Sequence, residues 1–417
     1  MKKMIVSILL LSLLLPLSAQ KSGFNYDESK VPSYSLPDLF VTEKGKPVRT
    51  ARRWERIRRP EILHLFETQV YGISPAAPAG MHARVEKVVD DAFGGAGTLK
   101  EVTLFLDPAE TYPVHLLIAV PKNAAGPVPA FLGMNFWGNH TTTDDPNVTI
   151  PDGWKGAYSG KAVTDHPRAF NAERWPFQYI LDQGYAVVTY CREDIDPDFD
   201  DGFRNGVHRL MDGDTPRTGT SWGTIAAWAW SLSRALDYLN ADPDIDASRV
   251  AVFGHSRLGK TALWAGAQDP RFALVISNCS GCGGAALSRR CFGETVGRIN
   301  SSFPHWFCSN FHQYSDHEAD LPVDQHELLA LIAPRPLYVD SASEDLWADP
   351  RGEYLSLYEA SKVYALYGYD TLTDPESPEI GHPVVRGRTG YHIRQGKHNI
   401  LLYDWQQFIS FADRFLK

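Results

Sequence analysis

The sequence of 417 residues has few cysteines and, after its first 20 residues, no long uncharged apolar run. Five cysteines are too few for a disulfide-dense small scaffold, and their odd number leaves at least one unpaired within the chain. Without a further apolar run, we expect the mature protein to be soluble. No internal repeat or low-complexity linker divides the chain, so we expect one domain.

The first 20 residues, MKKMIVSILLLSLLLPLSAQ, have the pattern of a secretory signal peptide. Two lysines precede an apolar run from Met4 to Leu15, and cleavage is expected after Ala19 or Gln20. The alternative is a membrane anchor, but the run is short for a bilayer, and no cysteine follows it for a lipoprotein anchor. We therefore expect an exported protein, periplasmic or secreted, whose mature domain spans 21–417.

The charge of the chain is mildly acidic. Loss of Lys2 and Lys3 with the signal peptide changes the formal net charge from −9 to −11. This balance favours neither nucleic acid nor an anionic membrane as a partner. The apolar content of 43% suits a globular protein with a large core. The 11 tryptophans could pack in that core or stack on sugars, and composition alone favours core packing.

Apolar periodicity predicts alternating strands and helices along the chain. An N-terminal helix over 49–72 has Trp54, Ile57, Ile62, Leu63 and Phe66 on its apolar face, and Pro60 should interrupt it. Further helices are predicted at 220–240, 257–268, 352–367 and 404–416. Strands are predicted at 101–107, 112–122, 128–139, 184–194, 249–253, 272–278, 335–340 and 383–393.

This order predicts an α/β fold, in which helices cover both faces of a mostly parallel twisted sheet that begins with antiparallel strands. Long irregular insertions are expected at 140–180, 195–218 and 280–330. Loops of this length in a compact domain usually shape a site.

A strand, a sharp turn and a helix are predicted over 251–266, AVFGHSRLGKTALWAG, with Ser256 at the turn. Serine nucleophiles of α/β-hydrolases lie on such turns within G-x-S-x-G. Gly254 fits this pattern, but the second glycine comes one residue late, at Gly259. The alternative is an ordinary strand–helix junction that holds a serine.

A serine nucleophile needs a base and a carboxylate that orients the base, and α/β-hydrolases carry them in the order serine, acid, histidine. The strand at 335–340 precedes Glu344 and Asp345, which are both candidates for the acid, and the strand at 383–393 precedes His398. His392 is a second candidate for the base, but it falls inside the strand pattern. We therefore predict a triad of Ser256, His398 and an acid that is Asp345 or Glu344.

The residues after the serine predict an oxyanion site. The backbone N–H of Arg257 would point at the oxyanion at the start of the helix, with a second donor from the loop after 128–134. Arg257 and Lys260 place two cations in the first helical turn, where they oppose the helix dipole. Either both side chains bind an anion or both project into solvent, and the helix dipole alone does not decide between these alternatives.

Two other patterns are interpreted as structural. Cys279 and Cys282 have C-x-x-C spacing, but no second pair follows at the spacing of a zinc site, so we expect no metal. Asp196, Asp198 and Asp200 alternate as in a calcium-binding loop. This stretch has neither the glycine nor the glutamate that such a loop requires. We interpret 192–202 as a solvated loop whose acids cap turns.

The stretch GHSRLGKTAL resembles the G-x-S-R-x-G-K-x-A-L signature of carbohydrate esterase family 15, the glucuronoyl esterases. The similarity covers nearly the whole mature chain and is greatest with the bacterial branch; it includes LPDLF, RRPEILHLFETQVYG, DIDPDF, SGCGGAAL, LIAPRPLYVDSASEDLWADP and GKHNILLYDWQQFISFADRFL. The resemblance explains the late glycine, because the family has it there. It implies an α/β-hydrolase fold and hydrolysis of the ester between 4-O-methyl-glucuronic acid on xylan and lignin alcohols.

The resemblance also implies roles for single residues. Arg257 would help to stabilise the oxyanion, and His398 of the GKH motif would be the base. Lys260, Glu294 and Trp347 would bind the sugar. Cys279 stands where many members carry the acid, which leaves that role to Asp345, as in some bacterial members. His255 stands where fungal members have a disulfide cysteine, so we expect no disulfide beside the site.

We expect a monomer that needs no cofactor and takes glucuronoxylan or lignin–carbohydrate esters as its substrate. Two other functions remain open. An acetyl-xylan or other carboxylic esterase could use the same fold, because fold does not fix substrate. A hydrolase-fold protein could instead bind carbohydrate without turnover, which an incomplete triad would indicate.

Overall fold

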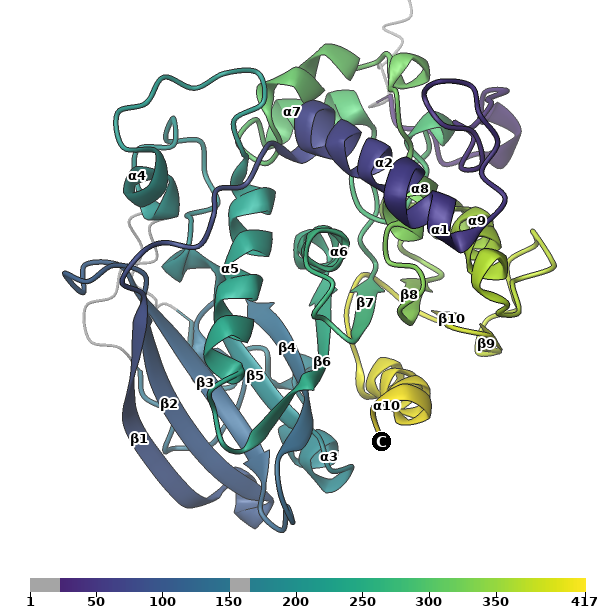
Figure 1. Ribbon diagram of the computed structural model, residues 1–417. Coiled ribbons are helices and arrows are strands. Elements are labelled where there is room, and N and C mark those ends of the chain that lie inside the picture. Colours follow the sequence, from purple (N-terminus) through teal and green to yellow (C-terminus); the bar gives the residue numbers. More distant parts are fainter. Residues whose placement is uncertain (1–22, 151–165) are drawn as a thin grey trace, which may run out of the picture.

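The computed structural model describes residues 23–150 and 166–417; the expected signal peptide lies outside them, as does part of the insertion at 140–180. The described residues form a ten-stranded sheet in the order β1-β2-β3-β5-β4-β6-β7-β8-β10-β9 (Figure 1). The six strands from β5 to β10 in this order are parallel, and antiparallel strands flank them on both sides. A mostly parallel sheet with leading antiparallel strands is thus confirmed.

The strands have the following bounds: β1 His82–Ala92, β2 Gly97–Phe105, β3 Pro113–Pro121, β4 Val128–Asn135, β5 Ala186–Cys191, β6 Ile245–His255, β7 Leu274–Asn278, β8 Leu337–Ala342, β9 Val384–Arg386 and β10 Thr389–Arg394. The α-helices are α1 Ala51–Arg53, α2 Arg59–Phe66, α3 Phe177–Asp182, α4 Gly206–Asp212, α5 Thr224–Leu239, α6 Arg257–Gln268, α7 Val296–Ser302, α8 Gln325–Ala330, α9 Pro350–Ser361 and α10 Leu402–Leu416. Within the described residues, no helix combines the length and apolar character needed to cross a bilayer.

Helices cover both faces of the sheet, because side chains of the central strands alternate between two apolar cores. Leu132 of β4 packs in the core that includes α2, α5, α6, α8 and α9. Its neighbour Phe131 packs in the core that includes α3 and α10. This three-layer arrangement is that of the predicted α/β-hydrolase fold, and it brings the carboxyl ends of β6, β7, β8 and β10 to one edge of the sheet.

The predicted N-terminal helix continues past Pro60 and is not broken there. The chain is helical from α1 to Tyr71, and a π-helical turn at Trp54–Arg58 precedes α2. Proline has no N–H for the bond to the preceding turn, and the wider turn accommodates its ring. The predicted apolar face was partly wrong: Ile57 is exposed and Leu63 only partly buried, whereas Trp54, Ile62 and Phe66 are fully buried.

Three other predictions need correction. The strand expected at 383–393 is two antiparallel strands, β9 and β10, joined by a turn at Gly387. The helix expected at 352–367 is α-helical only to Ser361 and then becomes a 3₁₀ helix. The edge strand β1 was missed, because most of its side chains are exposed and give no apolar signal.

Candidate active site

Ser256 lies at a strained turn between β6 and α6. Its φ is 61° and its ψ is −129°, outside the regions that side chains usually adopt. Its N–H donates to the carbonyl of Asn278 at 2.9 Å, and its carbonyl accepts from Gly259 at 2.8 Å. These bonds hold the turn in the conformation that exposes a nucleophile at the top of the sheet.

Both glycines of this motif are required by close contacts. A Cβ at Gly254 would lie 1.9 Å from the carbonyl oxygen of Leu258, inside the turn. A Cβ at Gly259 would lie 2.9 Å from the Cβ of Ser280, on the segment that follows β7. The late glycine therefore lets α6 approach the loop after the neighbouring strand.

Asp345 and His398 form a hydrogen-bonded pair. Asp345 follows β8 and His398 follows β10, and the imidazole Nδ1 lies 2.5 Å from the Asp345 Oδ2. The Asp345 side chain is 5% exposed and the His398 side chain 39% exposed. Both line a cavity of about 410 Å³ together with Ser256. The order of the three residues in sequence thus corresponds to one cluster in space.

The rival residues are engaged elsewhere. Glu344 is exposed and its carboxylate accepts a hydrogen bond from Gln395 at 2.8 Å. His392 is buried on β10, where Nδ1 contacts the Tyr338 hydroxyl at 3.0 Å and Nε2 contacts Asp404 at 2.8 Å. Neither lines the cavity around Ser256.

A buried guanidinium supports the loop that carries His398. Arg394 donates from Nε to Asp404 at 2.9 Å and from Nη2 to the carbonyls of Lys397 at 3.0 Å and Asn399 at 2.6 Å. These two carbonyls flank His398 on either side. Sequence reasoning missed this support, because an arginine at the end of a strand gives no signal of what it contacts.

Cys279 follows β7 directly and lines the same cavity. Its φ is 46° and its N–H donates to the Asp340 carbonyl at 2.9 Å. Burial raises the pKa of this thiol well above its usual value, and the nearby Asp340 carboxylate adds to the rise. A protonated thiol cannot replace a carboxylate as the partner of His398.

His255 packs against His398 with ring centroids 4.5 Å apart. Its Nδ1 also contacts Asn278 Oδ1. Burial lowers the pKa of His255 well below its usual value, and the neighbouring His398 lowers it further. All five cysteines are free thiols, so the disulfide is absent as expected.

Arg257 is held by a buried carboxylate and does not project into solvent. Its Nη1 contacts Asp198 Oδ2, and its guanidinium lies 4.7 Å from the Trp306 ring centroid. Asp198 also accepts hydrogen bonds from Trp306 Nε1 at 2.6 Å and contacts His305 Nε2 at 3.0 Å. The guanidinium is thereby fixed beside the cavity that Ser256 lines.

The solvated loop predicted at 192–202 is therefore wrong for most of its acids, because the side chains of Glu193, Asp194, Asp196 and Asp198 are all buried. Asp198 is buried among cations, and Asp196 is buried and accepts from the Thr224 hydroxyl at 2.6 Å. Asp200 and Asp201 do cap turns, as predicted. Asp196 and Asp198 have partners distant in sequence, which a local pattern cannot reveal.

The cavity is also lined by a pair of oppositely charged side chains, Lys260 and Glu294. Lys260 donates to the carbonyl of Ser280 at 2.5 Å, and its Nζ lies 3.9 Å from Glu294 Oε2. Burial raises the pKa of Glu294 and lowers that of Lys260. Trp347 and Trp306 add aromatic surface to the lining. Trp306, Phe303 and Arg298 were not predicted as lining residues.

The predicted second oxyanion donor remains a prediction. The loop after β4 does lie beside the turn, since the Phe136 ring is 6.1 Å from that of His255.

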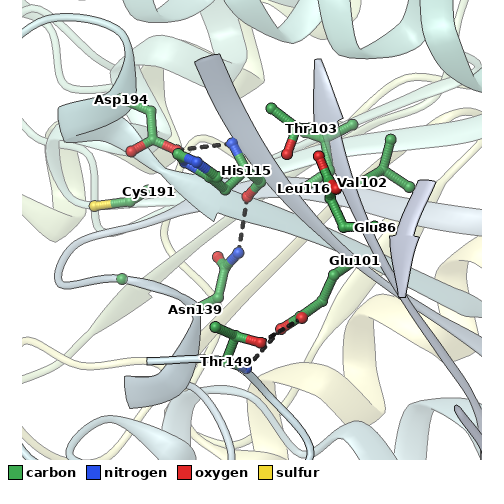
Figure 2. A pocket seen from close by; sticks show the side chains of 11 residues that line it. Glu86, Glu101, Val102, Thr103, His115, Leu116, Asn139, Thr149, Cys191 and Asp194 are labelled. Carbon is green, nitrogen blue, oxygen red and sulfur yellow. Dashed lines mark hydrogen bonds and ion pairs between the residues drawn. The ribbon is translucent and has the colours of Figure 1, made fainter. Parts of the chain in front are cut away.

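A second pocket, of about 180 Å³, lies between β2, β3 and the loop after β4 (Figure 2). Its polar groups bond to one another: His115 Nδ1 lies 3.0 Å from Asp194, and Glu101 accepts from the backbone and hydroxyl of Thr149 at 2.6 Å. Its lining includes no serine. Of these two pockets, the cavity around Ser256 is the one lined by a serine, a histidine and an acid that follow strands of the sheet.

Comparison with known proteins identifies the family of this chain. The family described as glucuronyl esterase of fungi matches residues 145–368. A carbohydrate esterase from an unknown prokaryotic organism, MZ0003, is 48% identical over 95% of this chain and 93% of its own length. A 4-O-methyl-glucuronoyl methylesterase of Wolfiporia cocos is 30% identical over 82% of this chain and 74% of its own. The solved structure of a glucuronoyl esterase from Solibacter usitatus superimposes with a TM-score of 0.88 at 44% identity, covering 92% of this chain and 99% of that one. The chain therefore belongs to carbohydrate esterase family 15, the glucuronoyl esterases, and is a carboxylic ester hydrolase.

Proposed function

We propose that this esterase hydrolyses the ester between 4-O-methyl-glucuronic acid side chains of glucuronoxylan and lignin alcohols, with Ser256, His398 and Asp345 as its triad. The observation that carries the proposal is the 2.5 Å contact between Asp345 and His398 at the cavity that Ser256 also lines. A carboxylate in this position fixes the imidazole tautomer and stabilises the imidazolium.

In the first step, His398 Nε2 takes the proton of Ser256 as Oγ attacks the ester carbonyl carbon. The N–H of Arg257 at the start of α6 faces the developing oxyanion, and its guanidinium, fixed by Asp198, adds positive charge. His398 then protonates the leaving alcohol. Water attacks the acyl-enzyme by the same proton transfers in reverse and releases the glucuronate.

Lys260, Glu294 and Trp347 form the proposed sugar site. An ammonium and a carboxylate that are both nearly buried are costly unless they form hydrogen bonds. Sugar hydroxyls can accept from Lys260 and donate to Glu294. The indole of Trp347 supplies an apolar face for the pyranose ring.

An acetyl-xylan or other carboxylic esterase is the second candidate, in which the sugar supplies the alcohol and not the acid. Arg257, Lys260 and Glu294 line the cavity that holds Ser256. They favour a glucuronate ester as the substrate, because in that ester the sugar ring is on the acyl side and would contact them. Carbohydrate binding without turnover is disfavoured, because the Asp345–His398 pair is complete.

The test is a panel of benzyl glucuronate, galacturonate and acetylated xylan esters. We expect the glucuronate ester to be preferred, and Ser256→Ala to lose several orders of magnitude in kcat. Ser302→Ala is the matched control, since Ser302 at the end of α7 lines the same cavity outside the proposed triad. Undiminished activity in Ser256→Ala would refute the mechanism, and a preference for acetyl esters would refute the substrate.

Export, oligomeric state, domain extent and the absence of a cofactor are parts of the same proposal. The enzyme would be exported after removal of residues 1–20 and would act as a monomer on its polysaccharide. The segment 21–417 would form one catalytic domain. Nothing in the proposed mechanism requires a metal or another cofactor, because the triad supplies the nucleophile, the base and the orienting charge.

A further inference from the structure

Three potential metal ligands meet beside the nucleophile. The Cys279 sulfur, a carboxylate oxygen of Asp345 and a ring nitrogen of His398 all lie within 4.8 Å of one another. They follow β7, β8 and β10, which are consecutive parallel strands of the sheet. The fold itself therefore assembles the group, and the cysteine is the member that distinguishes it from an ordinary serine-esterase site.

The backbone holds each ligand in place. Cys279 is fixed by its bond to the Asp340 carbonyl, and the Asp345 N–H donates to the Ala342 carbonyl at 3.0 Å. Arg394 supports the loop of His398. All three side chains line the cavity of about 410 Å³, which gives an ion a path from solvent.

The donor set selects the kind of ion. A thiolate, an imidazole and a carboxylate suit Zn²⁺ or the softer Cd²⁺ in a tetrahedral site with water as the fourth ligand. A second cluster, Asp340 with His392 and Asp404, offers no thiol, is fully buried, and has Asp404 bonded to Arg394. We therefore consider only the Cys279 cluster.

We propose that Cys279, Asp345 and His398 capture a thiophilic divalent cation, Zn²⁺ or Cd²⁺, and that this capture switches the esterase off. The metal forms bonds to Cys279 Sγ, His398 Nδ1 and one Asp345 oxygen. The thiol proton leaves to solvent, and the Nδ1 proton of the neutral imidazole is replaced by one on Nε2. No oxidant or reductant is needed.

Loss of esterase activity would follow from the ligand distances and from the position of the proton on the His398 imidazole. Ligands of a tetrahedral zinc ion lie about 3.3 Å apart for bonds of about 2.0–2.1 Å, whereas Nδ1 and Oδ2 are 2.5 Å apart in the triad. The metal thus replaces the hydrogen bond between Asp345 and His398. With its proton on Nε2, His398 cannot accept the proton of Ser256. Metal binding is independent of the proposed function, but its inhibitory effect rests on the proposed role of His398.

The experiment combines two measurements on the full mature chain. Cd²⁺ titration is followed by the ultraviolet charge-transfer absorption of cadmium thiolate. Zn²⁺ titration is followed by esterase rate in a non-chelating buffer. Cys279→Ser and Cys279→Ala are compared with Cys282→Ser, which removes another buried thiol three residues away. Each rate is expressed relative to the metal-free rate of the same variant, and circular dichroism checks folding.

We expect wild type and Cys282→Ser to show the absorption and to be inhibited reversibly, with activity restored by EDTA. Both Cys279 variants should lose the absorption and need at least about tenfold more Zn²⁺ for the same inhibition. Equal absorption or equal sensitivity in the Cys279 variants would overturn the site. Absorption that depends on Cys279 but leaves the rate unchanged would support the site and refute His398 as the base.

Discussion

Replacement of Asp345 by asparagine tests the residue on which the triad depends. The amide keeps the shape of the side chain but removes the charge that stabilises the His398 imidazolium. Unit charges about 4 Å apart at an effective dielectric constant of about 20 interact by about 4 kcal/mol. The His398 side chain is 39% exposed, which weakens this interaction. We therefore expect kcat to fall by a factor of about 10² to 10³, with KM little changed.

The assay is steady-state hydrolysis of a benzyl glucuronate ester. Glu344→Gln is the matched control and should change kcat less than about twofold, because Glu344 is exposed and bonded to Gln395. The double variant Asp345→Asn with Cys279→Asp moves the carboxylate to the loop after β7 and should recover part of the loss. Intact activity in Asp345→Asn together with lost activity in Glu344→Gln would refute our assignment of the acid. If neither change affects kcat, a triad acid is not required.

Three further changes test the turn, the loop and a buried acid. Gly254→Ala should lower the urea midpoint by the equivalent of about 3 kcal/mol or more, because its Cβ would lie 1.9 Å from a carbonyl oxygen; an unchanged midpoint would contradict the turn geometry. Arg394→Gln should reduce kcat about tenfold at constant KM, with Arg394→Lys recovering part of the loss; a change in melting temperature alone would make the arginine merely structural. Burial raises the pKa of Glu353 to about 8, so the folded protein holds a proton that the unfolded chain releases above about pH 4.5. The free energy of unfolding should thus fall as pH rises from about 4.5 to about 8, and Glu353→Gln should flatten this slope in urea titrations.

The local part of the site could be predicted from the sequence because its determinants are local. A short apolar strand, a glycine, a serine and a helix define the turn at Ser256 within a few residues. Chain order indicated Asp345 or Glu344 as the acid and His398 as the base, because parallel strands bring their carboxyl ends to one edge. The same reasoning separated His398 from His392, since one follows β10 and the other lies within it.

Other features depend on contacts between distant parts of the chain, and no local pattern reveals them. Asp198 alternates with other acids and resembles a solvated residue, but it is buried against Arg257 and Trp306, 59 and 108 residues away. The support of His398 by Arg394 likewise requires the loop conformation. Edge strand β1 was missed for a different reason, because an exposed strand carries little apolar alternation.

The acid of the triad is defined by where its carboxylate lies and not by the strand that precedes it. Because β7 and β8 are adjacent and parallel, residues after either strand reach the same side of His398. Here Asp345 after β8 forms the hydrogen bond, and the position after β7 is left to Cys279. That position remains beside the imidazole whatever residue occupies it. A carboxylate there would compete with Asp345, whereas a thiol leaves the triad intact and adds a metal-sensitive ligand.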